Sequence, residues 1–375
     1  MKKQLLFLLM VTFSTMTMWA QSFTSGNLNY NVMSTNPNTV AVVSYETKPS
    51  GQLVIPATVS YNDEDYSVTG FIYGLALYGC TEVTSIVLPS TMSDIYSTEV
   101  FYCCENLESI TVDADNASYS TKDGVLFNKA GTELIVYPRA KPDESYTIPD
   151  GVTTIGWCSI TGCSKLKSLN IPASVETIDY GSLNSCPSLT SVTVDAGNAN
   201  YSSKDGVLFN KAGTELITYP AGKSGASYTI PDGVTTINSD AFQDCTNLTS
   251  LTIPASVTTI GEYAFGSEET ISNITDIYCY ADPSQSSWNY FAFVFFKKNK
   301  STKCHVKDAS AWQQKFGDLN LTFVGDLDEI DAIDAVTPSF SKGDGAWYTL
   351  SGMKLEGEPT EKGIYVKDGK KVLLK

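Results

Sequence analysis

The segment CTNLTSLTIPASVTTI, residues 245–260, decides the fold, because its spacing recurs along the chain. A cysteine is followed by apolar residues three, six and eight positions later, with polar residues between the last two. Such alternation is typical of a short β-strand. Four further segments share the spacing and begin at Cys80, Cys104, Cys163 and Cys186. A repeated unit of 20–30 residues with aligned apolar columns predicts a solenoid.

A longer period contains the short one. KDGVLFNKAGTELI stands at 122–135 and again at 204–217, and YTIPDGVTTI stands at 146–155 and again at 228–237. The two pairs have the same offset, that from position 122 to position 204, so a long block is repeated. Each block holds two turns of about 23 residues and one longer turn. In the longer turn, GVLFN and TELIVYP flank a Lys-Ala-Gly turn and predict a β-hairpin.

The energetics explain why such units occur in series. One unit offers about six core side chains, each worth roughly 1.5–3 kcal/mol when buried. Ordering its residues costs about 1.5 kcal/mol apiece, or roughly 35 kcal/mol in all. A single unit therefore does not fold alone. Stacked units bury both apolar faces and pair their strands, so we expect short parallel strands throughout.

These motifs resemble the BspA-like leucine-rich repeats of exported Bacteroidetes proteins. The resemblance rests on LTSLTIPASVTTIGEYAF at 248–265 and on YTIPDGVTTI, and the segments 28–32 and 54–71 are similar to the entry segment of that family. It covers roughly residues 23 to 325. The resemblance implies a β-rich leucine-rich-repeat solenoid that is secreted or displayed on the outer cell surface, and in several members a role in adhesion to host or bacterial partners.

The expected organisation has six parts. They are a signal peptide (1–20), an N-terminal β cap (21–65), leucine-rich repeats (66–280), a C-terminal cap (281–326), a linker (327–345) and a small β tail (346–375). The signal peptide is inferred from Lys2 and Lys3, a short apolar run and Ala20 at the cleavage point. The C-terminal cap should hold a helix over 308–317, capped by Asp308 or Ser310. The tail resembles Bacteroidetes sorting tails, and a small structural module is the alternative.

The charge balance restricts the partners. The formal net charge is −16, which disfavours nucleic acid and anionic membrane surfaces, since both are polyanions. After the signal peptide no segment reaches the 18 apolar residues of a membrane helix. An extracellular protein or glycan ligand is the remaining expectation.

The strands should present a column of small polar residues on one face. Five serines follow the cysteines at the fifth position: Ser85, Ser109, Ser168, Ser191 and Ser250. The seventh position holds Val87, Thr111, Asn170, Thr193 and Thr252. This Ser/Thr ladder is either a flat binding surface or a consequence of β-propensity and cross-strand pairing, and the second interpretation is favoured. The face has few aromatic or arginine anchors of the kind that dominate binding.

One loop has the composition of a calcium site. Asp113, Asp115 and Asn116 offer oxygen ligands, but the second copy replaces Asp115 with Gly197 and the spacing fits no EF-hand loop. Asx turns explain the same composition, and the sequence favours them. We expect no metal and no cofactor.

The residues for catalysis are sparse. The chain has one histidine, His305, and its neighbour Cys304 should point to the opposite face of a strand, so the two should not form a nucleophile–base pair. No pair of cysteines has zinc-ligand spacing, and no glycine loop suits a phosphate. A hydrolase with a carboxylate pair stays a remote alternative. The sequence therefore predicts that the protein is not an enzyme.

The nine cysteines suggest core packing more than cross-linking. Aligned cysteines in successive turns usually act as small buried side chains, so we expect free thiols in the column. Cys279 and Cys304 lie outside it and are the candidates for one disulfide.

The function predicted from the sequence is non-enzymatic binding and adhesion to host or bacterial proteins. Carbohydrate binding in support of glycan capture is the second hypothesis. No binding residue is assigned, and the oligomeric state stays open. If Trp157, Tyr180 and Trp288 gathered in one exposed groove, they would identify the binding face.

Overall fold

The computed structural model describes residues 21–72, 76–95, 98–101, 104–266, 272–288, 302–317, 321–327 and parts of 347–374. The predicted signal peptide and linker lie outside these residues, apart from Leu327. The chain forms two compact units. The first comprises residues up to Leu189 together with Asp195–Asn200, and the second comprises Thr190–Val194 and the chain from Tyr201 onward.

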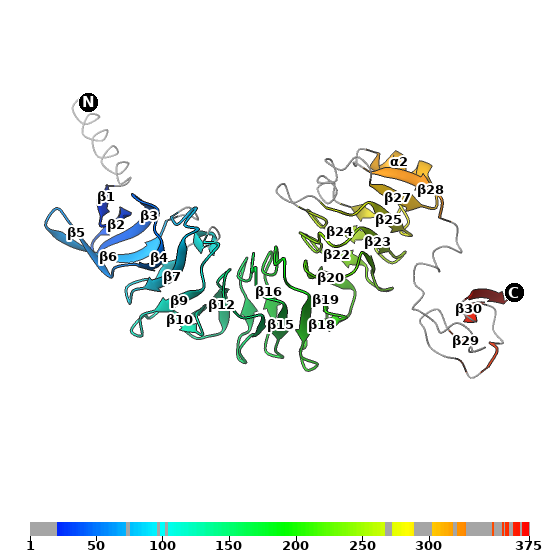
Figure 1. The fold of residues 1–375 in the computed structure, drawn as a ribbon, viewed down its shortest axis with the longest axis horizontal. Coiled ribbons are helices and arrows are strands. Elements are labelled where there is room, and N and C mark those ends of the chain that lie inside the picture. Colours follow the sequence, from blue (N-terminus) through cyan, green and yellow to red (C-terminus); the bar gives the residue numbers. More distant parts are fainter. Residues whose placement is uncertain are drawn as a thin grey trace, which may run out of the picture. The chain divides into compact units, whose positions relative to one another are not determined.

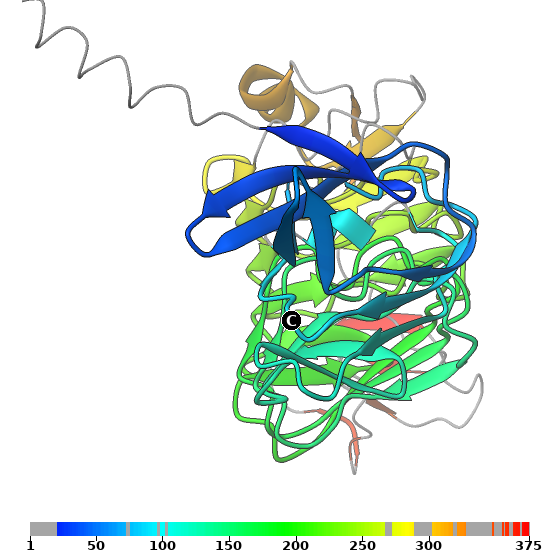
Figure 2. The same cartoon turned by 90° about the vertical axis from the view of Figure 1, so that its left-hand side faces the viewer.

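The first unit begins with a mixed sheet, seen in blue in Figure 2. Its strands follow the order β1-β2-β3-β6-β5, and β8 pairs with β6. Their bounds are β1 Ser22–Ser25, β2 Leu28–Thr35, β3 Asn38–Tyr45, β5 Thr58–Tyr61, β6 Glu64–Phe71 and β8 Asp94–Ile95. Tyr30, Val40 and Val68 are buried in this sheet and join the core of the repeats.

Successive turns of the first unit pair through parallel strands (Figure 1), as the sequence predicts. One ladder joins β4 (Gly51–Val54), β7 (Val83–Leu88) and β9 (Ser109–Val112), with the 3-10 helix η1 (Thr98–Phe101) between the last two. Another joins β13 (Ser145–Thr147) to β15 (Ser168–Ile171). A third runs from β12 (Glu133–Val136) through β14 (Thr154–Ile155) to β16 (Thr177–Ile178).

The predicted hairpin is present, but it has three strands. β11 (Val125–Asn128) and β12 pair antiparallel, as expected. The segment before them adds a third strand that was not predicted from the sequence, β10 (Tyr119–Lys122), which pairs antiparallel with β11. Asp123 and Gly124 connect β10 to β11 with φ values of 52° and 78°, the left-handed pair of a type I′ turn.

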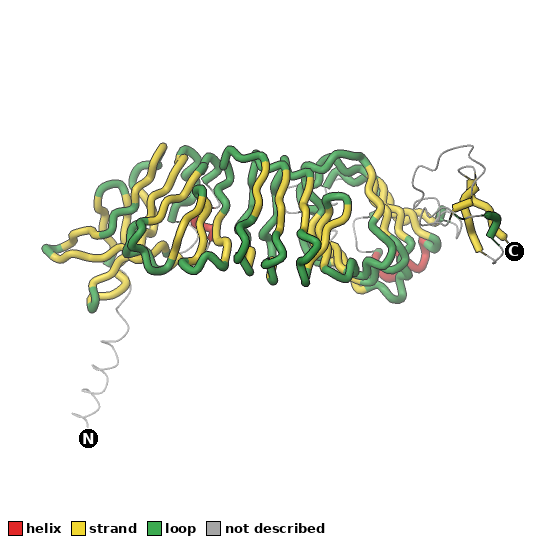
Figure 3. The backbone as a smooth tube through the Cα atoms, turned by 90° about the horizontal axis from the view of Figure 1, so that it is seen from below, coloured by secondary structure: helices red, strands yellow, loops and turns green. Residues whose placement is uncertain are grey.

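The second unit repeats this arrangement. Its first ladder has the order β18-β19-β20-β22-β24-β26 and its second has the order β21-β23-β25-β27-β28. The strands are β17 Ser191–Val194, β18 Tyr201–Lys204, β19 Val207–Asn210, β20 Glu215–Thr218, β21 Ser227–Thr229, β22 Thr236–Ile237, β23 Ser250–Ile253, β24 Thr259–Ile260, β25 Asp276–Cys279, β26 Ser287–Trp288, β27 Lys303–Val306 and β28 Thr322–Gly325. Figure 3 shows how far strands and loops dominate the fold.

The predicted helix closes the second unit. It is α2 (Ala309–Phe316), and of the two predicted caps Asp308 is the one used, since its carboxylate accepts from the amides of Ser310 at 2.9 Å and Ala311 at 3.1 Å. Trp312 is 1% exposed and lies 4.6 Å, ring to ring, from Trp288. Beyond it, β29 (Trp347–Tyr348), β30 (Gly363–Lys367) and β31 (Lys370–Leu374) form a separate antiparallel sheet.

The repeated apolar and cysteine positions form the core of each unit. The five column cysteines are between 0% and 6% exposed and remain thiols outside any disulfide, which confirms the prediction for them. Four Pro-x-x-Val segments of the repeats are turns, in which the valine amide donates to the proline carbonyl, as Val175 does to Pro172 and Val257 to Pro254. This bond explains why IPASV recurs: the turn returns the chain to the next strand.

The candidate disulfide between Cys279 and Cys304 is not formed. Both are buried thiols, on the neighbouring strands β25 and β27, and neither forms a disulfide. A hydrogen bond with the Cys279 thiol, together with burial, raises the pKa of Cys304 well above its usual value. The pair fills the core as thiols, in the same way as the column.

Candidate functional site

Two exposed aromatic side chains lie in successive turns of the first unit. Trp157 is 40% exposed and Tyr180 is 53% exposed, and each follows the short strand of its turn. Ile155 pairs with Ile178 in register, and the amide of Cys158 donates to the carbonyl of Tyr180 at 3.3 Å. The backbones of the two aromatic residues therefore lie next to each other, one turn apart. Large exposed aromatic side chains are typical anchors of binding surfaces.

Trp288 does not join them. It is only 8% exposed, and its ring packs against Trp312 and Phe316 under the closing helix of the second unit. The expected group of three aromatic residues is thus a pair, and Trp288 belongs to the core.

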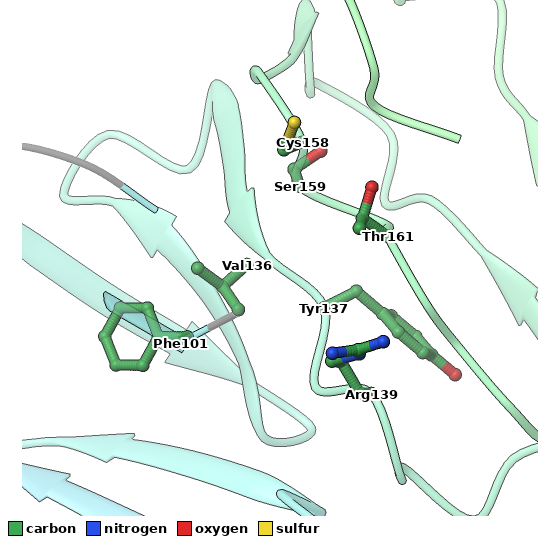
Figure 4. Close-up of a pocket in the computed structure, with 7 residues that line it drawn as sticks. All are labelled: Phe101, Val136, Tyr137, Arg139, Cys158, Ser159 and Thr161. Carbon is green, nitrogen blue, oxygen red and sulfur yellow. The ribbon is translucent and has the colours of Figure 1, made fainter. Parts of the chain in front are cut away.

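A small pocket adjoins the aromatic pair along the chain. Its walls come from three successive parts of the first unit (Figure 4): Phe101, then Val136, Tyr137 and Arg139, then Cys158, Ser159 and Thr161. Arg139 is the only arginine of the chain, and none of the lining residues carries a carboxylate. The pocket is therefore a locally cationic place on an acidic protein.

The polar groups of the pocket are held by the backbone around them. Arg139 donates from Nε to the carbonyl of Gly162 at 3.4 Å, and Thr161 donates its hydroxyl to the carbonyl of Gly181 at 2.9 Å. The Ser159 side chain is 1% exposed, and its Oγ has no hydrogen-bond partner among the described residues. A buried hydroxyl without a partner costs free energy, which a bound polar group would recover.

Tyr137 contributes differently. Its hydroxyl is also buried without a partner in the described part of the chain, but its ring packs against Tyr146 at 4.9 Å, and burial raises the pKa of its hydroxyl. Tyr137 therefore stays protonated at neutral pH and forms a wall of the pocket.

The second copy of the block has no equivalent of this site. At the offset that separates the two copies, Arg139 corresponds to Ala221, Cys158 to Asp240 and Ser159 to Ala241. The exposed pair Trp157 and Tyr180 corresponds to Ser239 and Glu262. The repeated hairpin is thus the same in both units, whereas the residues next to it differ.

The loop considered for calcium holds the backbone instead. The Asp113 carboxylate accepts from the amide of Asp115 at 2.9 Å, which is the Asx turn favoured by the sequence. Asn116 is fully buried, donates to the carbonyls of Pro89 and Met92, and accepts from two amides. Asn116 therefore links two turns of the solenoid.

The single histidine lies in a charged cluster of the second unit. Nδ1 of His305 lies 2.8 Å from an Asp326 oxygen, Nε2 lies 3.3 Å from Asp276, and the ring stacks on Tyr278 at 4.6 Å. Cys304 is buried on the opposite face of β27, as predicted. Both ring nitrogens are engaged by carboxylates, so the cluster joins strands and offers no nucleophile.

The Ser/Thr ladder is partly a set of cross-strand pairs. Ser168 donates to the hydroxyl of Ser145 at 2.8 Å, and Asn170 donates to Thr147 at 3.1 Å. Thr252, predicted to face outward, is only 8% exposed. These contacts favour the structural interpretation of the ladder.

Metal clusters and membrane helices are both missing from the described part of the chain. No cluster of three or more His, Cys, Asp or Glu side chains there is arranged to hold a metal ion. No helix among the described residues has the length and apolar character needed to cross a bilayer.

The ladders of parallel strands, and the aromatic pair that they expose, define a class: a solenoid protein with an exposed aromatic surface. The sequence matches the family described as "BspA type Leucine rich repeat region" in six copies, over residues 69–129, 141–214 and 221–330. The chain belongs to this family of leucine-rich-repeat proteins.

Solved structures of similar fold come from several bacteria. A leucine rich cell surface protein from Faecalibacterium prausnitzii is 18% identical, with 79% of this chain and 97% of that chain covered and a TM-score of 0.38. The pneumococcal vaccine antigen PcpA is 17% identical, with 82% and 99% covered and a TM-score of 0.39. A leucine-rich repeat protein from Bacteroides ovatus is 18% identical, with 77% and 80% covered and a TM-score of 0.31. No curated protein matches the chain.

Proposed function

We propose that this chain is an exported or cell-surface protein that binds a protein partner outside the cell and performs no chemistry itself. One observation carries the proposal: Trp157 and Tyr180, both large and exposed, lie in adjacent turns of a rigid ladder. Aromatic anchors on such a ladder lose little entropy on binding. The family membership supports a binding role.

The test compares the full mature chain on an array of extracellular-matrix proteins and on a glycan array. Saturable binding to a matrix protein is expected, and Trp157→Ala and Tyr180→Ala should each weaken it at least tenfold. Tyr78→Ala is the control, because Tyr78 is 61% exposed in another turn. Binding that is equally weakened by Tyr78→Ala, or unchanged by the first two variants, would contradict the assignment of the surface.

Carbohydrate capture is the second candidate, and the same aromatic pair favours it. The face of an indole or phenol ring packs well on the C–H groups of a sugar ring, and binding sites commonly combine aromatic walls with a few polar groups. The pocket around Arg139 adds such groups next to the pair. Saturable binding on the glycan array alone would select this candidate over the protein partner.

The role of the tail is a separate proposal. We infer that residues 346–375 act as a sorting signal, on the resemblance of LSG, KGIYV and DGKKVLLK to the sorting tails of Bacteroidetes proteins. Deleting them should abolish surface display while the rest of the chain still folds and is exported. Unchanged display would show that the tail is a structural module.

A further inference from the structure

The pocket beside the aromatic pair combines three features that point to one kind of ligand. It holds a permanent positive charge at Arg139, a buried Ser159 hydroxyl with no hydrogen-bond partner in the described part of the chain, and no carboxylate among its lining residues. A guanidinium binds a carboxylate through two parallel hydrogen bonds, and a serine hydroxyl can donate a third. The chemistry of the pocket therefore suits a carboxylate group.

Gly162 is the residue that makes room for the arginine. A Cβ placed on Gly162 would clash with the guanidinium of Arg139, and its φ of +67° favours glycine as well. In the second copy an aspartate, Asp244, stands at this position, and Ala221 replaces the arginine. The guanidinium thus lies against the backbone of the neighbouring turn only in the first unit.

The surroundings indicate what carries the carboxylate. The pocket is small and suits a single acidic group, while Trp157 directly precedes the lining residue Cys158. The amide of Cys158 donates to the carbonyl of Tyr180, so the backbones of both aromatic residues adjoin this lining residue. A sugar ring on the rim can place its carboxylate in the pocket, whereas a polyanionic chain is opposed by the net charge of −16.

We propose that this pocket binds the carboxylate of a single acidic sugar residue, with Arg139 and Ser159 as its hydrogen-bond donors and Trp157 and Tyr180 as the surface for the sugar ring. The proposal rests on the carbohydrate candidate above and states its ligand class.

Two sugars that differ only in the acidic group provide the test. Methyl β-D-glucuronide and methyl β-D-glucoside share the ring, but the second has a hydroxymethyl group in place of the carboxylate. Titrated into the full mature chain by calorimetry, the glucuronide should bind at least tenfold more tightly than the glucoside. Acetate and an acetylated aspartate peptide are the other arms, and both should bind at least tenfold more weakly than the glucuronide.

The second copy supplies variants that the fold already accommodates. Arg139→Ala and Ser159→Ala install its residues, and they should reduce glucuronide affinity at least tenfold and roughly threefold, respectively. Arg139→Lys should recover part of the loss, because it keeps the charge without the planar fork. Lys129→Ala is the matched control. It removes an exposed positive charge from the hairpin that precedes Arg139, and it should leave the affinity unchanged. The Nζ of Lys129 donates to the carbonyl of Ala114 at 3.4 Å, outside the pocket.

Cys158 gives a second measurement that does not depend on affinity. It lines the pocket and is partly exposed, so its alkylation by iodoacetamide, followed by mass spectrometry, should slow when methyl glucuronide is bound. Protection of Cys158 by the glucuronide and not by the glucoside supports the proposal.

Equal binding of the two sugars, or a glucuronide affinity unaffected by Arg139→Ala, overturns it. Tighter binding of the acetylated peptide than of the glucuronide overturns the sugar and assigns the pocket to a protein carboxylate. The outcomes also separate the two levels of inference. A chain that binds neutral glycans or a matrix protein but not glucuronide contradicts this proposal alone, while a chain that binds none of them contradicts the proposed function too.

Discussion

The two hairpin-bearing turns, residues 119–136 and 201–218, have matching backbones and different surroundings. β10, β11 and β12 pair in the same registers as β18, β19 and β20, with the same irregularity in the last pair. Beside the first hairpin lie an arginine, a thiol and an unpartnered hydroxyl, and beside the second lie alanines and aspartates. The difference shows which residues the architecture requires and which are available for a ligand.

Residues that hold the backbone recur in both copies. Asn116 and Asn198 both donate to two carbonyls of the preceding turn, and Asn128 and Asn210 both accept from the two amides that open the following strand. All of these contacts except the one from the Thr132 amide are partly or fully buried, so losing one leaves donors or acceptors unpaired. They provide the strongest tests of the equivalence of the two turns.

The largest expected effect comes from the buried asparagines. Asn116→Ala removes the bonds that its side chain donates to the carbonyls of Pro89 and Met92 and the two that it accepts from backbone amides, and should lower the free energy of unfolding by about 3–5 kcal/mol. Asn198→Ala should cost a similar amount. Hydrogen exchange of peptides around each asparagine measures the loss at each site. Asp115→Ala is the control, since only the backbone amide of Asp115 makes a contact in the described part of the chain. A cost below about 1 kcal/mol for Asn116→Ala would contradict the role of this asparagine in joining the two turns.

Two glycines of the first hairpin distinguish the cost of backbone strain from the cost of too little room for a side chain. Gly124 and Gly131 have φ values of 78° and 71°, but a Cβ on Gly124 would lie 3.0 Å from Ser109, whereas a Cβ on Gly131 would meet nothing within 4 Å. Gly131→Ala should therefore cost about 1 kcal/mol, and Gly124→Ala about 2 kcal/mol. Urea unfolding of the two variants measures the difference. Equal costs would show that Ser109 yields without strain.

Placing the missing arginine in the second copy sharpens the comparison. The Oδ1 atom of Asp244 is buried without a partner among the described residues, and Ala221 stands where the first unit has Arg139. In the position that Arg139 takes, a guanidinium would meet the Cβ of Asp244, so Ala221→Arg should adopt another rotamer to pair with this carboxylate. It should then stabilise the second unit by about 1 kcal/mol, without creating a pocket for glucuronide. Thermal unfolding and the sugar titration measure the two effects. Ala221→Lys keeps the charge and should give less, and a destabilising arginine would show that Asp244 cannot move to receive it.

The smallest expected effect is on the stability of the second unit at low pH. The hydroxyl of Thr275, and after it His305, holds the pKa of Asp276 below its usual value. A lowered folded pKa contributes stability above the unfolded value of about 3.9, and this stability is lost as the pH falls through the folded value. Asp276→Asn should cost about 0.5 kcal/mol at neutral pH, because the side chain is partly exposed, and should make the stability of the second unit alone fall less steeply in acid. Hydrogen exchange at pH 7 and at about pH 3.5 measures it, and an unchanged acid limb would contradict the role of Asp276.

Much of this fold can be predicted from patterns among residues that are close together in the sequence. The Cys-apolar spacing predicted the parallel ladders, and Asp308 the start of the helix, because both depend on neighbours in the chain. β10 was missed because its side chains do not alternate between buried and exposed, although Asp123 and Gly124 carry the signature of a two-residue hairpin. Trp288 is buried because α2, a later element of the chain, packs over its ring, and the local sequence around Trp288 does not indicate this.

The site was only partly visible in the sequence. Trp157 and Tyr180 were candidates by type, but only the register of β14 and β16 makes them neighbours. The sequence could have indicated Arg139 as a candidate site residue. It is the only arginine of the chain, and it stands where the second copy of the block has an alanine. The unpartnered Ser159 hydroxyl depends on packing around a single atom, which no pattern of residue types records.

The turns at Asp123-Gly124 and Asp205-Gly206 have a consequence for how such chains change length. The carbonyl of Gly124 accepts a hydrogen bond from the amide of Ile110, and the carbonyl of Gly206 accepts one from the amide of Val192. The block between the two turns therefore has an equivalent hydrogen bond at each end. Adding or removing one block would leave every local register at the junction as it was. Recombination between the two copies of KDGVLFNKAGTELI would thus yield longer or shorter family members in steps of one whole block, each still able to fold.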